Sequence, residues 1–258
     1  MGALSGRHAL ITGGGTGIGA AIARRLAADG ANVTITGRRA APLTALAKEL
    51  PRACAVVANV TQAADCRAMV TAAQAAFGPL DIVIVNAGGA ESAAFSDLDA
   101  DQWQRMLDVN LTGAYLTVQA AREDLVRAGD RDRSLRRLVF IASTAGIKGY
   151  PYVAAYVAAK HGVVGLMRAL AAEYARTALT VNAICPGFTE TPLLDVSIAN
   201  IVAKTSRSQG DARDALARHN PQGRLIQPAE VADAVAWVCS PAAQSITGQA
   251  IAVSGGET

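Results

Sequence analysis

Short apolar segments alternate with longer segments of helical period along the whole chain. The apolar segments are rich in β-branched residues and show no polar alternation; they are His8–Thr12, Asn32–Thr36, Cys54–Ala58, Asp81–Val85, Leu138–Ala142, Leu179–Ile184 and Gln249–Val253. Continuous apolar runs of this length are typical of strands covered by helices on both faces of a parallel sheet. The pattern predicts an α/β fold with a doubly wound parallel sheet of about seven strands.

The segments between the strands differ in length and polarity. Gly17–Asp29 and Gln62–Phe77 place Ala, Ile and Leu at helical spacing and end near glycines, as helices often do. Asp101–Arg127 and Val153–Ala175 are longer and apolar on more than one face, so we expect them to pack on the sheet and to form a subunit interface as well. The polar segment Glu190–Arg224 predicts a substrate lid at about residues 190–225 of a single domain, 1–258.

Composition and charge exclude several classes of protein. The chain has 258 residues, 51% of them hydrophobic, and a formal net charge of +3. Apart from Arg131–Arg137 the basic residues are scattered, so we expect no nucleic-acid partner. The cysteines form no C-x-x-C pair and the histidines show no ligand spacing, which indicates a reducing compartment and no metal site.

Targeting signals are not evident either. Residues 1–7 lack the basic and apolar regions of a signal peptide. No uninterrupted apolar run reaches the roughly 18 residues that a membrane span requires. We therefore expect a cytoplasmic protein that does not enter a membrane.

A glycine-rich turn directly follows the first predicted strand. It reads Thr12-Gly13-Gly14-Gly15-Thr16-Gly17-Ile18-Gly19 and opens the first predicted helix. Glycines allow a sharp turn and a close approach of the backbone to a pyrophosphate, and a helix N-terminus offers free N–H groups to it. Because strand, turn and helix come in this order, the turn predicts a Rossmann-type dinucleotide site; it is not a P-loop, since no Lys-Ser/Thr follows the glycines.

The residues after the second strand bear on the choice of nucleotide. An acidic residue is common there and receives the ribose hydroxyls, but this chain has Arg38 and Arg39. A guanidinium can bind a 2′-phosphate that a carboxylate would repel. We favour NADP(H), with NAD(H) as the alternative if both arginines are ordinary solvated residues.

A tyrosine and a lysine are placed to act together. Tyr156 and Lys160 are four residues apart in a helical segment, so their side chains leave the same face one turn apart. A phenol with a pKa of about 10 is a poor base at neutral pH, and a nearby ammonium favours the phenolate. Taken alone this spacing is common among surface pairs, so the assignment depends on its surroundings.

Other polar residues follow predicted strands, where parallel sheets bind ligands. Ser143 lies just after Leu138–Ala142 and can hold a carbonyl oxygen, or it can simply cap a turn before Gly146. Asn86-Ala87-Gly88 ends another strand. There we expect a structural role for Asn86 and room for the cofactor at Gly88.

From Gly6 to about Gly256 these residues resemble the short-chain dehydrogenase/reductase family. The resemblance rests on motifs in the family's order and at similar spacing: the turn Gly13–Gly19, Asn86-Ala87-Gly88, Asn110, Ser143, Tyr156 with Lys160, and Pro186-Gly187-Phe188-Thr189. It implies hydride transfer between a nicotinamide and a carbonyl or secondary alcohol, without a metal.

The resemblance also implies roles for individual residues. Tyr156 would be the general acid/base, Ser143 would orient the carbonyl, Lys160 would lower the tyrosine pKa and hold the ribose, and Asn110 would anchor a water relay. The implied cofactor contacts, besides Tyr156 and Lys160, are Gly13, Gly15, Thr16, Gly17, Ile18, Gly19, Arg38, Arg39, Asn59, Val60, Asn86, Ala87, Gly88, Pro186, Gly187 and Thr189. Of these, Thr189 would meet the carboxamide.

The chain departs from the family pattern at three places. Asn59-Val60 stands where the family often has an Asp at the adenine edge, which keeps a hydrogen-bonding amide but removes a charge. Val85 replaces the first Asn of the usual Asn-Asn-Ala-Gly. The connection Gly129–Arg137 is longer and more charged than is typical. None of these departures affects the four implied catalytic residues.

The substrate stays open between two kinds. Tyr152–Leu166 and Pro221-Gln222-Gly223-Arg224 are similar to bacterial β-ketoacyl thioester reductases, 3-hydroxyacyl-CoA dehydrogenases and polyketide ketoreductases, which implies a 3-oxoacyl (β-keto) thioester. Apolar Phe188, Leu193 and Leu194 would suit an acyl or aromatic group, or would only pack the lid. The alternative is a free secondary alcohol or ketone, aromatic, cyclic or sugar-derived.

Two further expectations follow from the resemblance. The family implies a homotetramer. A non-catalytic, dinucleotide-binding redox sensor is the competing class of function, although such a protein would have no need to retain Tyr156 and Lys160.

Overall fold

The sheet has the predicted parallel architecture. A computed structural model describes residues 2–127 and 135–258. Within them, seven strands pair in the order β3-β2-β1-β4-β5-β6-β7, and all are parallel. Their bounds are β1 His8–Thr12, β2 Asn32–Gly37, β3 Ala53–Val57, β4 Ile82–Val85, β5 Arg136–Ile141, β6 Leu179–Pro186 and β7 Ala250–Val253. The strand order reverses at β1 and β4, and the crevice at such a point is where doubly wound sheets bind ligands.

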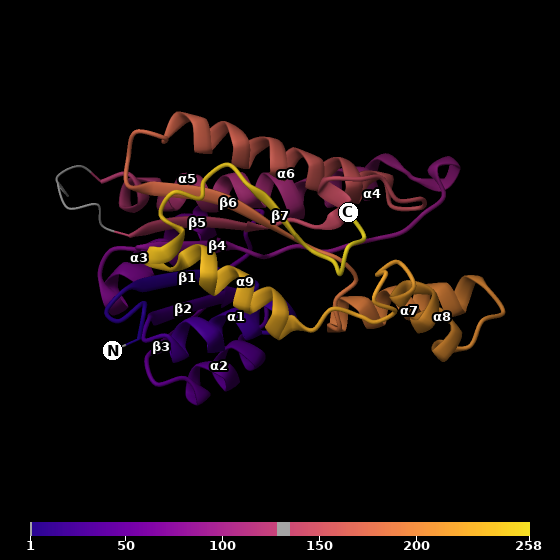
Figure 1. Cartoon of the computed structure of the whole chain (residues 1–258), viewed down its shortest axis with the longest axis horizontal. Helices are drawn as coiled ribbons and strands as arrows, with labels where there is room; N and C mark the ends of the chain where they lie inside the picture. Colours follow the sequence, from indigo (N-terminus) through magenta and orange to yellow (C-terminus); the bar gives the residue numbers. More distant parts are fainter. Residues whose placement is uncertain (1, 128–134) are drawn as a thin grey trace.

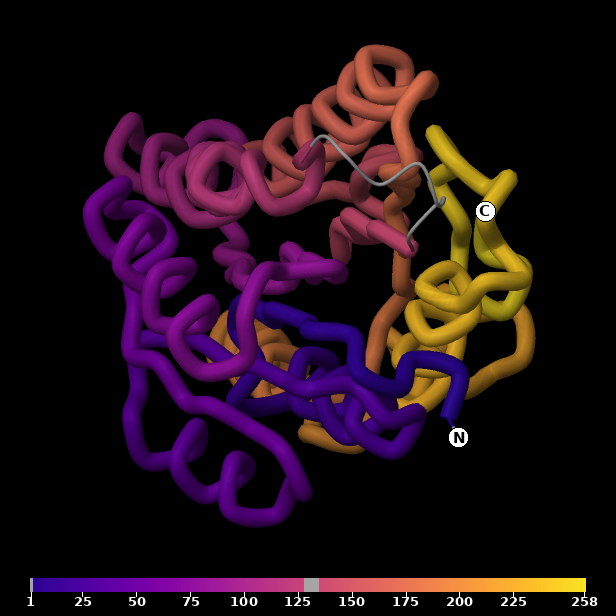
Figure 2. The backbone as a smooth tube through the Cα atoms, turned by 90° about the vertical axis from the view of Figure 1, so that its left-hand side faces the viewer, coloured from indigo at the N-terminus to yellow at the C-terminus, as the bar shows by residue number. Residues whose placement is uncertain are grey.

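Helices cover both faces of the sheet (Figures 1 and 2). One layer holds α1 (Gly17–Ala28), α2 (Ala40–Glu49) and α9 (Pro228–Cys239); the other holds α3 (Ala63–Phe77), α4 (Ala100–Leu107), α5 (Gly113–Leu125) and α6 (Ala154–Glu173). Side chains of each strand alternate between two cores: in β4, Ile82 and Ile84 pack with α1 and α9, whereas Val83 and Val85 pack with α3 and α5. Full burial stabilises each such side chain by about 1.5–3 kcal/mol, which explains why β4 is apolar on both of its faces.

The predicted helical segment Asp101–Arg127 is not one uniform helix. A π turn, Asp108–Thr112, joins α4 to α5. A Cβ on Gly113 would come within 2.8 Å of Val60 Cγ2, so the chain there lies close to the end of β3. The wider turn keeps apolar residues facing inward before and after it, and the hydrophobic period therefore did not reveal it. The other long segment, Val153–Ala175, forms α6 as predicted.

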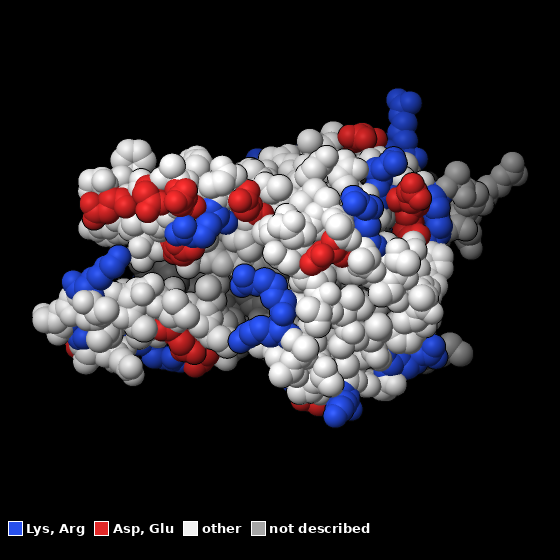
Figure 3. All heavy atoms as spheres, turned by 180° about the vertical axis from the view of Figure 1, so that it is seen from behind, with Lys and Arg blue, Asp and Glu red and all other residues white. Residues whose placement is uncertain are grey.

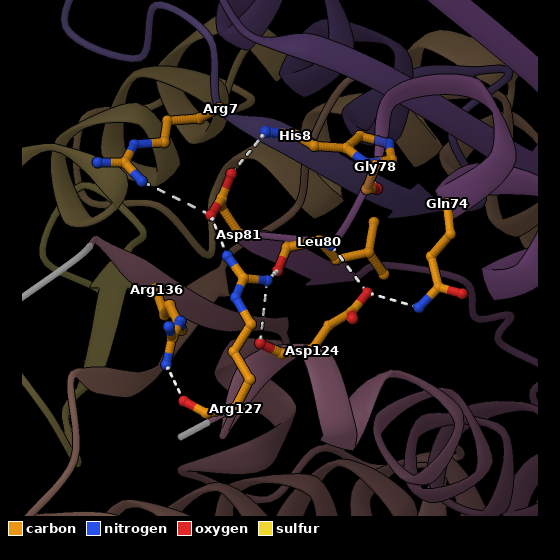
Figure 4. A network of polar contacts seen from close by, with 9 residues as sticks. All are labelled: Arg7, His8, Gln74, Gly78, Leu80, Asp81, Asp124, Arg127 and Arg136. Atoms are coloured by element: carbon orange, nitrogen blue, oxygen red, sulfur yellow. Dashed lines mark hydrogen bonds and ion pairs between the residues drawn. The ribbon is translucent and has the colours of Figure 1, made fainter. Parts of the chain in front are cut away.

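A polar network closes the sheet at the amino ends of β1 and β4 (Figure 4). Asp81 accepts hydrogen bonds from the backbone N–H of His8 at 3.0 Å and from Arg127 Nη2 at 3.0 Å. The His8 ring is buried; its Nδ1 lies 2.8 Å from the Gly78 carbonyl and its Nε2 lies 2.9 Å from Thr34 Oγ1. Because a carbonyl only accepts, Nδ1 carries the proton. The network is structural and lies at the opposite edge of the sheet from the carboxyl ends.

Strand β5 begins two residues before the predicted start at Leu138. Arg136 and Arg137 belong to the strand and are buried, and the guanidinium groups bond carbonyl oxygens: Arg136 Nη1 donates to Arg127 O at 2.9 Å and Arg137 Nη2 to Ser240 O at 3.1 Å. These bonds allow charged residues inside a buried strand, which composition did not indicate. The remainder of the basic segment and of the connection before β5, residues 128–134, lies outside the described residues.

The segment 190–225 leaves the body after β6 and carries α7 (Pro192–Lys204) and α8 (Gln209–Ala217) at one end of the molecule (Figure 1). It has a small core of its own, formed by Leu194, Ile198, Ala212, Leu216 and Leu225. Its base is closed where Ile226 N donates to Phe188 O at 2.9 Å and Glu190 N to Ile226 O at 2.9 Å. We call residues 190–225 the lid segment. Among the described residues, no helix combines the length and apolarity needed to cross a membrane.

Candidate active site

A cavity of about 1490 Å³ lies at the carboxyl ends of the strands. The ends of β2, β4, β5 and β6, the turn before α1 and the lid segment contribute its walls. Figure 3 shows the face behind that of Figure 1, where a hollow opens between two parts of the surface and basic side chains border it. Every residue that the sequence assigned to catalysis or to the cofactor lines this one cavity, so the fold brings the whole predicted set together.

The glycine turn is shaped for close approach. Gly13 has a φ of +64°, and a Cβ on Gly19 would stand 2.3 Å from the Gly13 carbonyl oxygen and 2.6 Å from Asn86 Nδ2. A backbone oxygen cannot give way at that distance. Gly19 therefore cannot be replaced without opening the turn, and the cradle fits the phosphates of a dinucleotide.

Asn86 fastens β4 to this turn. Its Nδ2 donates to the carbonyls of Thr12 at 2.8 Å and of Gly13 at 3.2 Å. Thr12 Oγ1 in turn accepts from the backbone N–H groups of Asn86 at 3.0 Å and of Ala87 at 3.1 Å. The amide nitrogen is occupied by backbone, which accords with the structural role expected for Asn86.

The adenine end of the cavity is polar and basic. Arg38 and Arg39 follow β2, are exposed and line the cavity, and neither has an ion pair with any residue in the described ranges. Asn59 and Val60 line the same end. Asn59 Oδ1 accepts from the backbone N–H of Thr61 at 3.2 Å, so this oxygen also stabilises the local turn.

Lys160 is a buried cation that lines the cavity. Its side chain leaves α6 and donates from Nζ to the Ile141 carbonyl at 3.0 Å, with only 5% of the residue exposed. Burial lowers the pKa of Lys160 to about 8. Nζ lies 5.6 Å from the centre of the Tyr156 ring, one turn earlier on the same face, as the spacing predicted.

Tyr156 is a neutral phenol in the protein alone. Burial raises the pKa of Tyr156 above its ordinary value, and the neighbouring Ser143 hydroxyl lowers it. Ser143 Oγ accepts from the Ala145 N–H at 3.0 Å and so caps a short 3₁₀ turn, Thr144–Gly146. The cap is confirmed, and Ser143 also lines the cavity, while its hold on a carbonyl oxygen stays a prediction.

Asn110 lies in the π turn, and its side chain bonds backbone at both ends. Nδ2 donates to Gly89 O at 2.9 Å and to Met106 O at 3.0 Å, and Oδ1 accepts from Gly89 N–H at 3.2 Å. A Cβ on Gly88 would lie 2.7 Å from Asn110 Oδ1 and 3.6 Å from Lys160 Nζ. The loop after β4 is thus held close to Lys160, and the water relay stays a prediction.

Comparison with known proteins decides the family. The family model described as Enoyl-(Acyl carrier protein) reductase matches residues 13–258. The chain belongs to the short-chain dehydrogenase/reductase family. As a member, it is an NAD(P)-dependent oxidoreductase that acts on a carbonyl or alcohol group.

Relatives and solved structures resemble this oxidoreductase over its full length. A structure of a variant of the actinorhodin polyketide ketoreductase with NADPH has a TM-score of 0.92 and 36% identity, covering 100% of this chain and 99% of that one. A 3-ketoacyl-(acyl-carrier-protein) reductase from Brucella melitensis, complexed with NADH, has a TM-score of 0.88 and 34% identity over 98% and 99%. A cis-4-hydroxycyclohexanecarboxylate dehydrogenase from Sinomonas cyclohexanicum is 38% identical over 99% and 98% of the two chains. The set is uniform in fold and mixed in substrate.

Three cavity-side residues escaped the sequence reasoning: Tyr150, His219 and Glu257. Tyr150 and His219 line the cavity, and Tyr150 Oη donates to Glu257 Oε1 at 2.5 Å across a separation of 107 residues. No motif or local period signals a contact of that range. Only the doubly wound topology, which places the end of β7 beside that of β6, brings them together.

Proposed function

We propose that this oxidoreductase transfers hydride between NADP(H) and the 3-oxo group of a β-keto thioester, with Tyr156 as the proton donor. One observation carries the catalytic part: Ser143, Tyr156 and the buried ammonium of Lys160 line the same cavity as the glycine turn. The alternative substrate, a free secondary alcohol or ketone, uses the same residues.

The residues present fit a dinucleotide. The turn from Gly13 to Gly19 would hold the pyrophosphate, Asn59 and Val60 would flank the adenine, and Thr189 would lie at the carboxamide. When bound, the nicotinamide supplies or accepts the hydride. Arg38, exposed and without a described ion pair, supports a 2′-phosphate and hence NADP(H) over NAD(H).

Three side chains then have different roles at the carbonyl oxygen. The Ser143 hydroxyl donates a hydrogen bond to this oxygen and orients it. Tyr156 gives its phenolic proton to the oxygen as negative charge develops there. Lys160, one turn away, stabilises the tyrosinate that remains. Without the Lys160 ammonium, the raised pKa of the buried Tyr156 would oppose the loss of its proton. Reversed, the same steps oxidise the alcohol.

The residues that line the cavity support a thioester. Apolar Phe188, Leu193 and Leu194 line it, and so do the exposed side chains of Lys204 and Arg207 from the lid segment. An acyl group would suit the apolar residues, while phosphates on a thioester carrier would suit the two cations.

The test follows NADPH absorbance with four substrates. We expect turnover of acetoacetyl-CoA. We expect slower turnover of the acetoacetyl thioester of N-acetylcysteamine, which lacks the phosphates of CoA. Lys204→Met with Arg207→Met should raise KM for the CoA ester about tenfold and leave KM for the short thioester unchanged. Turnover of only a ring ketone would support the alternative, and turnover of only crotonyl-CoA would refute carbonyl reduction.

Two variants test the assigned residues. Tyr156→Phe should abolish turnover while NADPH still binds, as titration of the bound nucleotide would measure, and retained activity would overturn its role. Arg38→Asp should weaken NADPH about 10- to 100-fold and leave NADH little changed, since a charged hydrogen bond contributes about 1.5–3 kcal/mol. An unchanged NADPH affinity would refute the role of Arg38.

Two exposed aromatic side chains support a homotetramer as part of the proposal. Trp103 of α4 is 38% exposed and Tyr115 of α5 is 48% exposed. An assembly that covered them would explain why two large aromatic side chains lie at the surface of neighbouring helices. Sedimentation analysis of the wild type and of a Tyr115→Glu variant would test it, with dissociation expected for the variant.

A further inference from the structure

A buried carboxylate lies behind the substrate end of the cavity. The side chain of Glu257 is 2% exposed. Its Oε1 accepts from Tyr150 Oη at 2.5 Å, pairs with Lys148 Nζ at 3.0 Å and lies 3.7 Å from His219 Nδ1. Its Oε2 is buried without a hydrogen-bond partner in the described structure, and a Cβ on Gly187 would lie 3.2 Å from it. One carboxylate thus contacts two separate segments of the chain.

The first segment is the loop after β5. Tyr150 Oη also lies 2.7 Å from Thr144 Oγ1, next to Ser143, and the Lys148 ammonium lies 4.9 Å from the centre of the Tyr150 ring. Burial and the Glu257 carboxylate raise the pKa of Tyr150, so its phenol keeps its proton and donates a hydrogen bond to the carboxylate. Further along this loop, Tyr152 has a φ of +66°, a conformation that tertiary contacts must hold in place.

The second segment is the base of the lid. His219 follows α8, and the next residue, Asn220, packs so tightly on Gly255 that a Cβ there would stand 1.9 Å from Asn220 Oδ1. Asn220 also bonds backbone within the lid, from Nδ2 to Arg224 O at 2.9 Å. The turn that carries Glu257 is therefore pressed against the lid.

Tyr150 and His219, both held by Glu257, form an aromatic wall with Phe188. The Tyr150 ring meets the Phe188 ring edge to face at 6.0 Å, and the His219 ring lies 5.1 Å from Phe188. All three side chains line the cavity that also holds Ser143 and Tyr156. Rings at these angles offer both an edge and a face to an aromatic ligand, and their arrangement depends on the groups that hold Tyr150 and His219.

We propose that Glu257 is a positioning residue that fastens the lid to the loop after β5 and so builds the Tyr150–Phe188–His219 wall, which selects substrates with a flat ring beside the reacting carbonyl. Glu257 itself does not touch the substrate. The inference deepens the proposed function, and rests on it only in taking Ser143 and Tyr156 as the reacting end.

The kinetic test compares Glu257→Gln with the wild type on two ketones, 1-tetralone and the flexible ethyl acetoacetate, at saturating NADPH. Glu257→Gln keeps the shape and removes the charge, and Glu173→Gln, on the exposed end of α6, is the matched control. We expect KM for tetralone to rise about tenfold, with kcat, KM for NADPH and KM for ethyl acetoacetate changed less than about twofold. Where turnover is too slow, ligand-observed NMR titration of tetralone gives the same comparison.

A purely structural role would give a different pattern. An equal rise of KM for both ketones, a loss confined to NADPH, or no change would overturn the proposal. Neither ketone is a thioester, so the result is independent of whether acetoacetyl-CoA is reduced. Hydrogen exchange of the protein without cofactor provides a second readout: exchange at residues 209–220 should quicken in Glu257→Gln, and unaltered exchange would count against the fastening role.

Tyr150→Phe keeps the test decisive if Glu257→Gln does not fold. It removes one hydroxyl and keeps the ring, and we expect the same selective rise of KM for tetralone. Where both variants fold, KM for tetralone should be no higher in the double variant than in Glu257→Gln alone, because both changes break the same Tyr150–Glu257 hydrogen bond. Additive losses, or an unchanged KM in Tyr150→Phe, would overturn the proposal.

Discussion

Replacing Lys160 by methionine should stabilise the protein while it removes the activity. Methionine has nearly the same length and no charge. The pKa of Lys160 is lowered by burial from 10.5 to about 8, which corresponds to a cost of about 3 kcal/mol for keeping the ammonium charged in the folded state. The variant loses the hydrogen bond to the Ile141 carbonyl, about 1 kcal/mol. The net gain is therefore about 2 kcal/mol at pH 7.

The stability advantage of Lys160→Met over the wild type should depend on pH. Between pH 8 and 10.5 the unfolded wild type still holds the proton that the folded protein has released, so the stability of the wild type rises with pH in that window. The advantage of Lys160→Met should be full below pH 8 and nearly vanish by pH 10. A change of 2 kcal/mol corresponds to roughly 4–8 °C in Tm at this chain length.

The assay is denaturant unfolding of the protein without cofactor at pH 7 and pH 10. Lys48→Met, on the exposed face of α2, is the matched control and should stay within about 0.5 kcal/mol of the wild type at both pH values. A Lys160→Met variant that is less stable than the wild type at pH 7, or whose advantage is the same at pH 10, would refute the reasoning.

Three shorter predictions concern the frame around the site. Burial lowers the pKa of His8, so the unfolded chain takes up the proton first and the free energy of unfolding should fall as pH drops from 7 to 5. Urea titrations of the wild type and His8→Gln check this, and an equal fall in the free energy of unfolding in both proteins would contradict it. Thr12→Val leaves two backbone N–H groups without their acceptor and should cost about 2–3 kcal/mol in thermal unfolding, whereas Thr12→Ser should not. Gly19→Ala should weaken NADPH at least about 100-fold by calorimetry, while Gly165→Ala, whose Cβ meets no atom within 4 Å, should bind normally; an intact Gly19→Ala site would disprove the cradle.

Local pattern was sufficient for the strands and for the main residues of the cavity. The seven apolar runs became β1 to β7 within two residues at each end. Tyr156 and Lys160 share a face because four residues make about one helical turn. Ser143 is found just after a strand because the apolar run Leu138–Ala142 marks where that strand ends. These features depend on neighbours in sequence, and sequence spacing therefore reveals them.

Other features depend on partners far along the chain. Arg136 and Arg137 are charged in the sequence but buried in β5, because the carbonyl oxygens of Arg127 and Ser240 accept hydrogen bonds from them. The π turn at Asn110 breaks a helix whose apolar period continues through it. The two arginines read as polar, so the hydrophobic pattern placed the strand start at Leu138, whereas the π turn leaves the pattern unchanged.

Sequence by itself determined the order of strands and helices, the glycine turn, the catalytic pair and the family, because each is carried by residue type and short spacing. Tertiary structure alone decided which side chains meet across the cavity. The carboxylate of Glu257 reaches the phenol of Tyr150 across 107 residues only because parallel strands deliver their carboxyl ends to one edge of the sheet. Burial at that edge then changes the chemistry of the groups assembled there, as the lowered pKa of Lys160 shows.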